Sequence, residues 1–166
     1  MGDLLYKEGH VGLTFLIMSI IMLPFPYSTN NLIMIVLASA FSALPDIDLE
    51  WQRKGYPVHH RGITHSILFA IIIGVIFGYV FWLANKTFLW AGMGFVSGFM
   101  AVVSHMVGDT FTYMKFKPFY PFNMKEISYG FCRANNKAAN EGLMTVGTIA
   151  FILYILFKEG ILFNLI

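Results

Sequence analysis

Charged residues are scarce in this chain of 166 residues. Asp, Glu, Lys and Arg together make up 12% of it, against about 25% in a typical soluble domain. Hydrophobic residues make up 57%, and the mean hydropathy is +0.68. This composition excludes intrinsic disorder and a coiled coil, and it indicates an integral membrane protein. The length predicts a single membrane-embedded domain over residues 1–166.

Cysteine is almost absent, since Cys132 is the only one. A single cysteine cannot form an intramolecular disulfide, and a thiolate metal cluster needs several cysteines. Disulfide-stabilised secreted folds are therefore excluded, and any metal site must use histidine and carboxylate ligands.

Five apolar runs predict an all-α bundle of about five transmembrane or membrane-embedded helices. The first, second and fifth runs are shorter than the roughly 20 residues that a spanning helix needs, whereas the third and fourth are long enough. The runs cover residues 11–23, 31–44, 63–83, 88–107 and 143–157. Gly74 and Gly78 in the third run, and Gly94 and Gly98 in the fourth, have the spacing that permits close helix packing.

The segments at residues 45–62 and 109–140 are long and polar, and they share a membrane face with the amino terminus if all five runs span. Only Lys86 and Lys158 then lie on the opposite face. The polar face holds the other nine of the eleven basic residues: Lys7, Arg53, Lys54, Arg61, Lys115, Lys117, Lys125, Arg133 and Lys137. The positive-inside rule places this face in the cytoplasm, and we expect membrane lipid as a partner.

Aromatic residues alternate with the lysines of the second polar segment. This pattern fits a loop that lies on the membrane surface, and the residues are Tyr113, Phe116, Phe119, Tyr120 and Phe122. The sequence contains no recognised nucleic-acid-binding motif.

Histidines and aspartates gather near the predicted cytoplasmic helix ends. The histidines are His10, His59, His60, His65 and His105, and the aspartates are Asp46, Asp48 and Asp109, with Asp3 as the exception. Four helix ends thus bring imidazoles and carboxylates to one level of the membrane. Zinc, manganese and iron all accept such a mixed ligand set.

Each local pattern also has a purely structural interpretation. His105 and Asp109 are four residues apart on one helix face, where they can share a metal or hydrogen-bond each other. Asp46 and Asp48 follow Pro45 and can supply oxygen ligands or simply end the helix as solvated acids.

The segment from residue 59 to residue 66 is the richest in polar side chains. Arg61 suits a phosphate or carboxylate, and Thr64 can cap the following helix or orient a ligand. The alternative is a histidine-rich helix cap at the level of the lipid headgroups.

Three motifs occur in a specific order: Leu-Pro-Asp46-x-Asp48, His60-Arg61-Gly-x-Thr64-His65-Ser, and His105-x-x-x-Asp109. They resemble the YdjM-like family of LexA-regulated, membrane-bound predicted metal-dependent hydrolases over nearly the whole chain. A more distant similarity is to zinc-dependent phospholipase C and the nuclease S1 group. The resemblance also includes an amino-terminal histidine, a proline-aromatic segment at residues 118–122 and a late glutamate, Glu141. It implies one or two divalent ions, zinc first, with ligands among His10, Asp46, His60, His65, His105, Asp109 and Glu141.

The sequence therefore predicts a membrane-bound metal-dependent hydrolase of a phosphate ester, such as a phospholipid, that uses metal-activated water. The expected catalytic residues are Asp48, which would orient an imidazole or accept a proton, Arg61, which would bind the phosphate, and Thr64. Two alternatives stay open: a metal-ion or proton transporter, and a non-enzymatic metal-stabilised membrane interaction protein.

Overall fold

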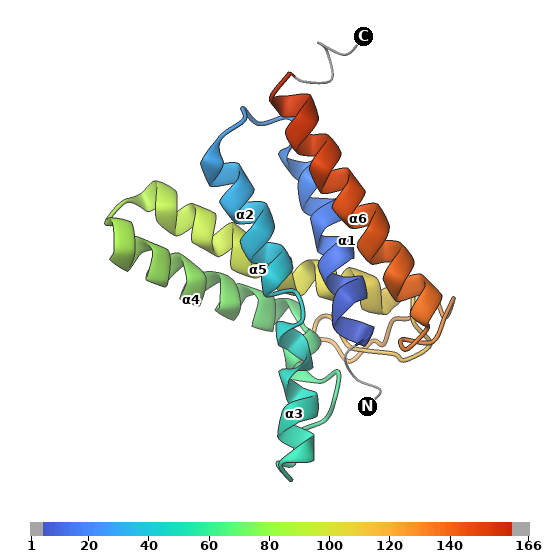
Figure 1. Ribbon diagram of the computed structural model, residues 1–166. Coiled ribbons are helices and arrows are strands. Elements are labelled where there is room, and N and C mark those ends of the chain that lie inside the picture. The colour runs from blue at the N-terminus through green and yellow to red at the C-terminus, as the bar shows by residue number, and fades with distance from the viewer. Residues whose placement is uncertain (1–4, 161–166) are drawn as a thin grey trace.

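The fold is an all-α membrane bundle, as the sequence predicts. The computed structural model describes residues 5–160. Its helices are α1 (Leu5–Met22), α2 (Thr29–Ala40), α3 (Ile47–Arg53), α4 (Ile67–Asn85), α5 (Phe88–Thr110) and α6 (Lys137–Lys158), with short 3-10 turns η1 (Leu44–Asp46) and η2 (Ile63–His65) (Figure 1).

Four helical segments are long and apolar enough to cross a membrane. They are Thr29–Arg53, Ile67–Asn85, Phe88–Thr110 and Lys137–Lys158. The first of these joins α2, η1 and α3 into one segment. The fifth long helix, α1, has 18 residues and begins with a polar turn that contains Lys7 and Glu8.

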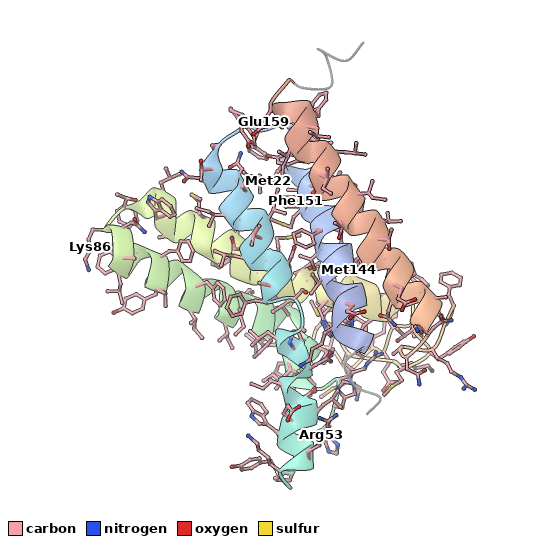
Figure 2. The ribbon with its side chains drawn as sticks, in the orientation of Figure 1. Met22, Arg53, Lys86, Met144, Phe151 and Glu159 are labelled. Atoms are coloured by element: carbon pink, nitrogen blue, oxygen red, sulfur yellow. The ribbon has the colours of Figure 1, made fainter. Side chains whose placement is uncertain are left out.

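The helices associate as two close pairs that are bridged by α2. Figure 1 shows α1 beside α6, while the hairpin of α4 and α5 splays away from them. The predicted glycine contacts in the hairpin are confirmed, because a Cβ atom on Gly94 would lie 2.6 Å from the Phe77 carbonyl oxygen. Phe151 of α6 stacks on Phe15 of α1, with ring centres 5.0 Å apart (Figure 2).

Several helix boundaries differ from the predicted runs. Pro45 lies in the 3-10 turn η1, and the chain then continues as α3 inside the segment that was expected to be a loop. Helix α4 begins at residue 67, because the Ser66 side chain accepts a hydrogen bond from the Phe69 amide. Helix α6 begins six residues before the apolar run, because Asn136 caps it in the same way.

One end of the bundle collects the polar segments. The starts of α1 and α6, the end of α5, helix α3 and the loop at residues 111–136 all lie there (Figure 1). Arg53 marks this end in Figure 2, and Lys86 and Glu159 lie far from it. The fold therefore brings the histidines and aspartates to one end of the molecule, as expected.

The loop at residues 111–136 does not lie wholly on the surface. Phe116 is buried against Ala70 and Val102, and its backbone pairs with that of Ile127. The expectation that Phe116 contacts the membrane is therefore wrong, because the loop folds back over the hairpin. Phe122 is 85% exposed and remains available to a membrane surface.

Candidate metal centre

Four donor atoms from three segments meet at the polar end of the bundle. They are Asp46 Oδ1 at the end of η1, His65 Nε2 at the end of η2, and His105 Nε2 and Asp109 Oδ2 on the last turns of α5. The two imidazole nitrogens are 3.1 Å apart. Each imidazole nitrogen lies 3.3–3.6 Å from both carboxylate oxygens. Two ligands of a tetrahedral zinc ion at about 2.0–2.1 Å lie about 3.3 Å apart, so these distances fit such an ion.

The hydrogen bonds of the two histidines leave both Nε2 atoms free to bind a cation. His105 Nδ1 is 2.8 Å from the Ser42 carbonyl oxygen, which can only accept, so Nδ1 carries the hydrogen. Thr64 donates its single hydroxyl hydrogen to Asp48 at 2.7 Å, and it therefore accepts from His65 Nδ1 at 3.0 Å. Both Nε2 atoms then have lone pairs that face each other. A shared cation stabilises this arrangement.

One of the two carboxylate donors provides a second indication that the site can hold a cation. Asp109 is buried, and its Oδ2 atom has no hydrogen-bond partner among residues 5–160. A buried carboxylate oxygen without a partner is costly unless a cation neutralises it. The donor set therefore fits a divalent ion both in chemistry and in spacing.

The His65 imidazole is surrounded by carboxylates. Its burial lowers the pKa, but the hydrogen-bonding carboxylates of Asp46 and Asp48 and the charge of Asp109 outweigh this effect and raise the pKa of His65 to about 9. In the metal-free protein, a proton on His65 thus supplies part of the positive charge that the carboxylates require.

Asp48 contacts both ends of the segment from His60 to Thr64 without facing the four donors directly. Its Oδ1 accepts from His60 Nδ1 at 2.8 Å, and its Oδ2 accepts from the Arg61 amide at 3.0 Å and from the Thr64 hydroxyl. Because both oxygens are already engaged, Asp48 is suited to orient His60 and His65. This agrees with the role expected of Asp48, and it gives Thr64 an orienting role as well.

Arg61 is positioned differently from what the sequence suggested. Its side chain is buried, and it donates to Asp109 Oδ1 at 2.6 Å, to Thr112 Oγ1 at 2.9 Å and to the Met114 carbonyl oxygen. The Arg61 guanidinium thus already has a carboxylate partner and holds Asp109 in place. The partner was not predictable because it lies on a distant helix.

His10 joins the cluster from α1. Its ring stacks on that of His105, with ring centres 3.8 Å apart, and its Nε2 is 4.0 Å from Asp109 Oδ1. Gly108 makes this approach possible, because a Cβ atom there would lie 2.9 Å from His10 Nδ1. Three overlapping groups able to hold a metal result: His10, His105 and Asp109; Asp46, His65 and His105; Asp48, His60 and His65.

The comparisons with known proteins identify the family of the chain. The family model of the YdjM inner membrane protein matches residues 5–163. The chain belongs to this family. A search of curated proteins and a search of solved structures each gave no significant match. Membership of the YdjM family, together with the four candidate spans, identifies a multi-span protein of the inner membrane.

Glu141 is not brought to the cluster in this member of the YdjM family. It is exposed, and it pairs with Lys137 at 3.6 Å in the first turns of α6. Because α6 begins at residue 137 and not at the apolar run, Glu141 lies on a solvated helical turn. We therefore leave Glu141 out of the ligand set. His59 is also exposed and outside the three groups.

A cavity of about 390 Å³ opens beside the metal centre. His10, Asp46, His60 and Asp109 line it, and Arg133 from the loop at residues 111–136 also contributes to its wall. The sequence indicated Arg133 only as a basic loop residue. The path of the loop at residues 111–136 brings Arg133 to the cavity wall, and no local sequence pattern revealed this path.

Proposed function

We propose that the protein is a metal-dependent hydrolase that acts on phosphate esters at the cytoplasmic membrane face. The observation that supports this most directly is the close spacing of the donors from Asp46, His65, His105 and Asp109, in which the two imidazole Nε2 atoms are 3.1 Å apart and each lies 3.3–3.6 Å from both carboxylate oxygens. The adjoining cavity is lined by Asp46 and Asp109 and gives a substrate access to them. A catalytic metal ion must keep a coordination position for water, and the cavity is the side from which that water would enter.

A divalent ion, zinc by preference, would supply Lewis-acid activation of water and of a phosphoryl oxygen when bound. The water oxygen attacks phosphorus, the bond from phosphorus to the ester oxygen breaks, and the leaving alcohol takes up a proton.

His60 is the proposed proton acceptor for this water. It lines the cavity, and its Nδ1–H is held by Asp48 at 2.8 Å, so the lone pair is on Nε2. A carboxylate that fixes the tautomer and stabilises the imidazolium is a common partner of a histidine base. Arg61 keeps Asp109 oriented.

A transport function has less support. No Asp, Glu, Lys, Arg or His occurs at residues 11–45, 67–85, 88–104 or 143–157. A proton or metal path across the membrane needs ionisable or coordinating groups near the middle of the spans. Here the ionisable groups gather at one end, which suits chemistry at the membrane surface.

The test combines elemental analysis with an assay. Protein purified in detergent is analysed by mass spectrometry for zinc, manganese and iron, and is then assayed for hydrolysis of soluble phosphate monoesters and diesters. We expect about one or two equivalents of metal in the parent protein, and loss of both metal and hydrolysis in Asp46→Asn and His105→Ala.

Glu141→Gln is the matched control, because it removes a carboxylate outside the cluster and should retain both properties. A folded parent protein that binds none of these metals when they are supplied would contradict the proposal. Hydrolysis that persists in Asp46→Asn and His105→Ala would contradict it equally.

A further inference from the structure

A second cavity lies next to the metal centre and differs from the first in character. It has a volume of about 280 Å³ and lies between α1, α5 and α6. Leu13, Phe111, Ala139 and Leu143 give it a mainly apolar wall. A small, water-soluble phosphate ester has no apolar part that would occupy this cavity.

The two cavities adjoin each other. His10, Arg133 and Ala134 line both of them. Their volumes of about 390 and 280 Å³ together fall in the range of ligand pockets, which is about 300–1,000 Å³. A molecule that occupied both would have a polar end beside the metal ligands and an apolar end between the helices.

Arg133 lies where the two parts of such a molecule would meet. No hydrogen bond or ion pair among residues 5–160 engages its guanidinium, in contrast to the guanidinium of Arg61, which is bound to Asp109. A guanidinium can bind a phosphate through two parallel hydrogen bonds. Arg133 is thus the available cation for an anionic group in the polar cavity.

Exposed aromatic rings pack against one wall residue of the apolar cavity. Phe111 contributes to its wall and packs against Tyr129 and Phe131, with ring centres 6.1 and 6.0 Å away. Tyr129 and Phe131 are 71% and 69% exposed. Such rings are typical of the membrane–water interface, where lipids are accessible.

We propose that the protein binds a membrane lipid that has a phosphorylated head group, with the phosphate at Arg133 beside the metal centre and an apolar chain in the cavity between α1, α5 and α6. As an assignment of the substrate, this inference rests on the proposed function. Its binding step, however, can be measured without turnover.

Native mass spectrometry of the detergent-purified protein provides that measurement. The protein is titrated with dioctanoyl phosphatidic acid, with dioctanoylglycerol, which lacks the phosphate, and with glycerol 3-phosphate, which lacks the chains. We expect phosphatidic acid to bind at least tenfold more tightly than either partial molecule, because only it occupies both cavities.

Two variants with matched controls locate the site. Arg133→Gln removes the cation, and Lys125→Gln removes an exposed cation of the same loop that lines neither cavity. Ala139→Leu fills the apolar cavity, and Ala138→Leu adds the same side chain at the adjacent, exposed position of α6. We expect Arg133→Gln and Ala139→Leu to weaken phosphatidic acid binding about tenfold, and the two controls to bind like the parent protein.

The outcomes separate this inference from the proposed function. Equal binding of phosphatidic acid and glycerol 3-phosphate, or unchanged binding in Ala139→Leu, would overturn the lipid site even if soluble esters are hydrolysed. Binding that depends on Arg133 and Ala139 as described would support the lipid site. If no metal-dependent hydrolysis accompanied that binding, only the proposed function would be contradicted.

Discussion

The two carboxylate oxygens of Asp109 have different surroundings. Oδ1 accepts the hydrogen bond from Arg61, and Oδ2 faces His65 and His105. Asp46, by comparison, is 13% exposed and faces only the two imidazoles and the cavity. The two aspartates should therefore contribute equally to metal binding and unequally to the stability of the metal-free protein.

Asp109→Asn tests this difference. In chelator we expect it to destabilise the protein by about 3 kcal/mol, because it leaves the buried Arg61 without its anionic partner. Asp46→Asn should lower the unfolding midpoint of the chelated protein less, because it removes one carboxylate partner of His65 but leaves no buried arginine without its anion. Thermal unfolding in detergent measures both, and equal destabilisation by the two variants would show that the Arg61 pair has no special role.

The raised pKa of His65 predicts how stability changes with pH. A proton that is bound more tightly in the folded state stabilises the protein below the ordinary pKa of 6.5, and this contribution is lost as the pH rises towards 9. The chelated protein should therefore lose stability between about pH 6.5 and 9, by at most roughly 3 kcal/mol.

Metal-loaded protein should not show this loss, because the ion replaces the proton. Unfolding midpoints measured from pH 6 to 10, with and without chelator, give the comparison. Parallel curves for the two forms would argue against an ion at His65.

For single residues, the sequence indicated the candidate metal ligands better than the groups that hydrogen-bond and orient these ligands. Asp46, His65, His105 and Asp109 were predictable because each lies where a helix ends. The Ser42 carbonyl oxygen that orients His105 was not predictable, since every residue has such an oxygen. The Arg61 pairing with Asp109 depends on how α5 is placed against the histidine segment, which is a tertiary property.

Among the helices, the pair α1 and α6 shows the closest approach. A Cβ atom on Gly147 would collide with the Gly12 carbonyl oxygen, and one on Gly12 would collide with the backbone at Met144. The sequence indicated the glycines of α4 and α5 through their four-residue spacing. Gly12 and Gly147 were missed because neither has a second glycine four residues away on its helix.

Gly147→Leu should separate α1 from α6 and destabilise the protein by about 1–3 kcal/mol or more. Gly142 of the same helix has open space around it, so Gly142→Ala should be neutral or stabilise by up to about 1 kcal/mol. Thermal unfolding in detergent compares them. Similar behaviour of the two variants would contradict a tight crossing at Gly147.

Helix boundaries show the limit of hydropathy as a guide. Residues 137–142 of α6 are polar or small, so the apolar run alone predicted a later start. Glu141, which the family resemblance had assigned to the site, lies within this early part of the helix. Helix α3 was missed for a similar reason, because Asp48, Glu50 and Arg53 make it appear to be a loop.

For the whole molecule, the positive-inside rule predicts that the candidate metal centre faces the cytoplasm. The single cysteine of the chain can be labelled to test this orientation. Cys132 lies on the metal-centre side, in the wall of the apolar cavity. Lys86 lies at the far end of the hairpin (Figure 2).

In intact cells, a membrane-impermeant maleimide should leave Cys132 unlabelled and should label Lys86→Cys in a Cys132→Ser background. Labelling of Cys132 after the membrane is permeabilised is the control for its reactivity. The reverse pattern in intact cells would place the metal centre outside the cytoplasm.

Composition and charge placement were sufficient to predict the bundle and its polar end. The angle at which α4 and α5 splay from α1 and α6 was not predictable, since it follows from side-chain packing around α2 (Figure 1). The apolar cavity beside the candidate metal centre depends on the same packing, and for that reason no sequence pattern predicted it.

The four donor atoms lie on both sides of the α4–α5 hairpin in the chain. Asp46 and His65 are synthesised before the hairpin, and His105 and Asp109 come at its end. During synthesis, the first two must therefore wait until both helices have entered the membrane and the hairpin has folded back. A metal bound by all four donors would connect segments that no single helix holds together, so its uptake would be a late step of biogenesis. Resistance to chelators would thus report how many molecules have completed assembly.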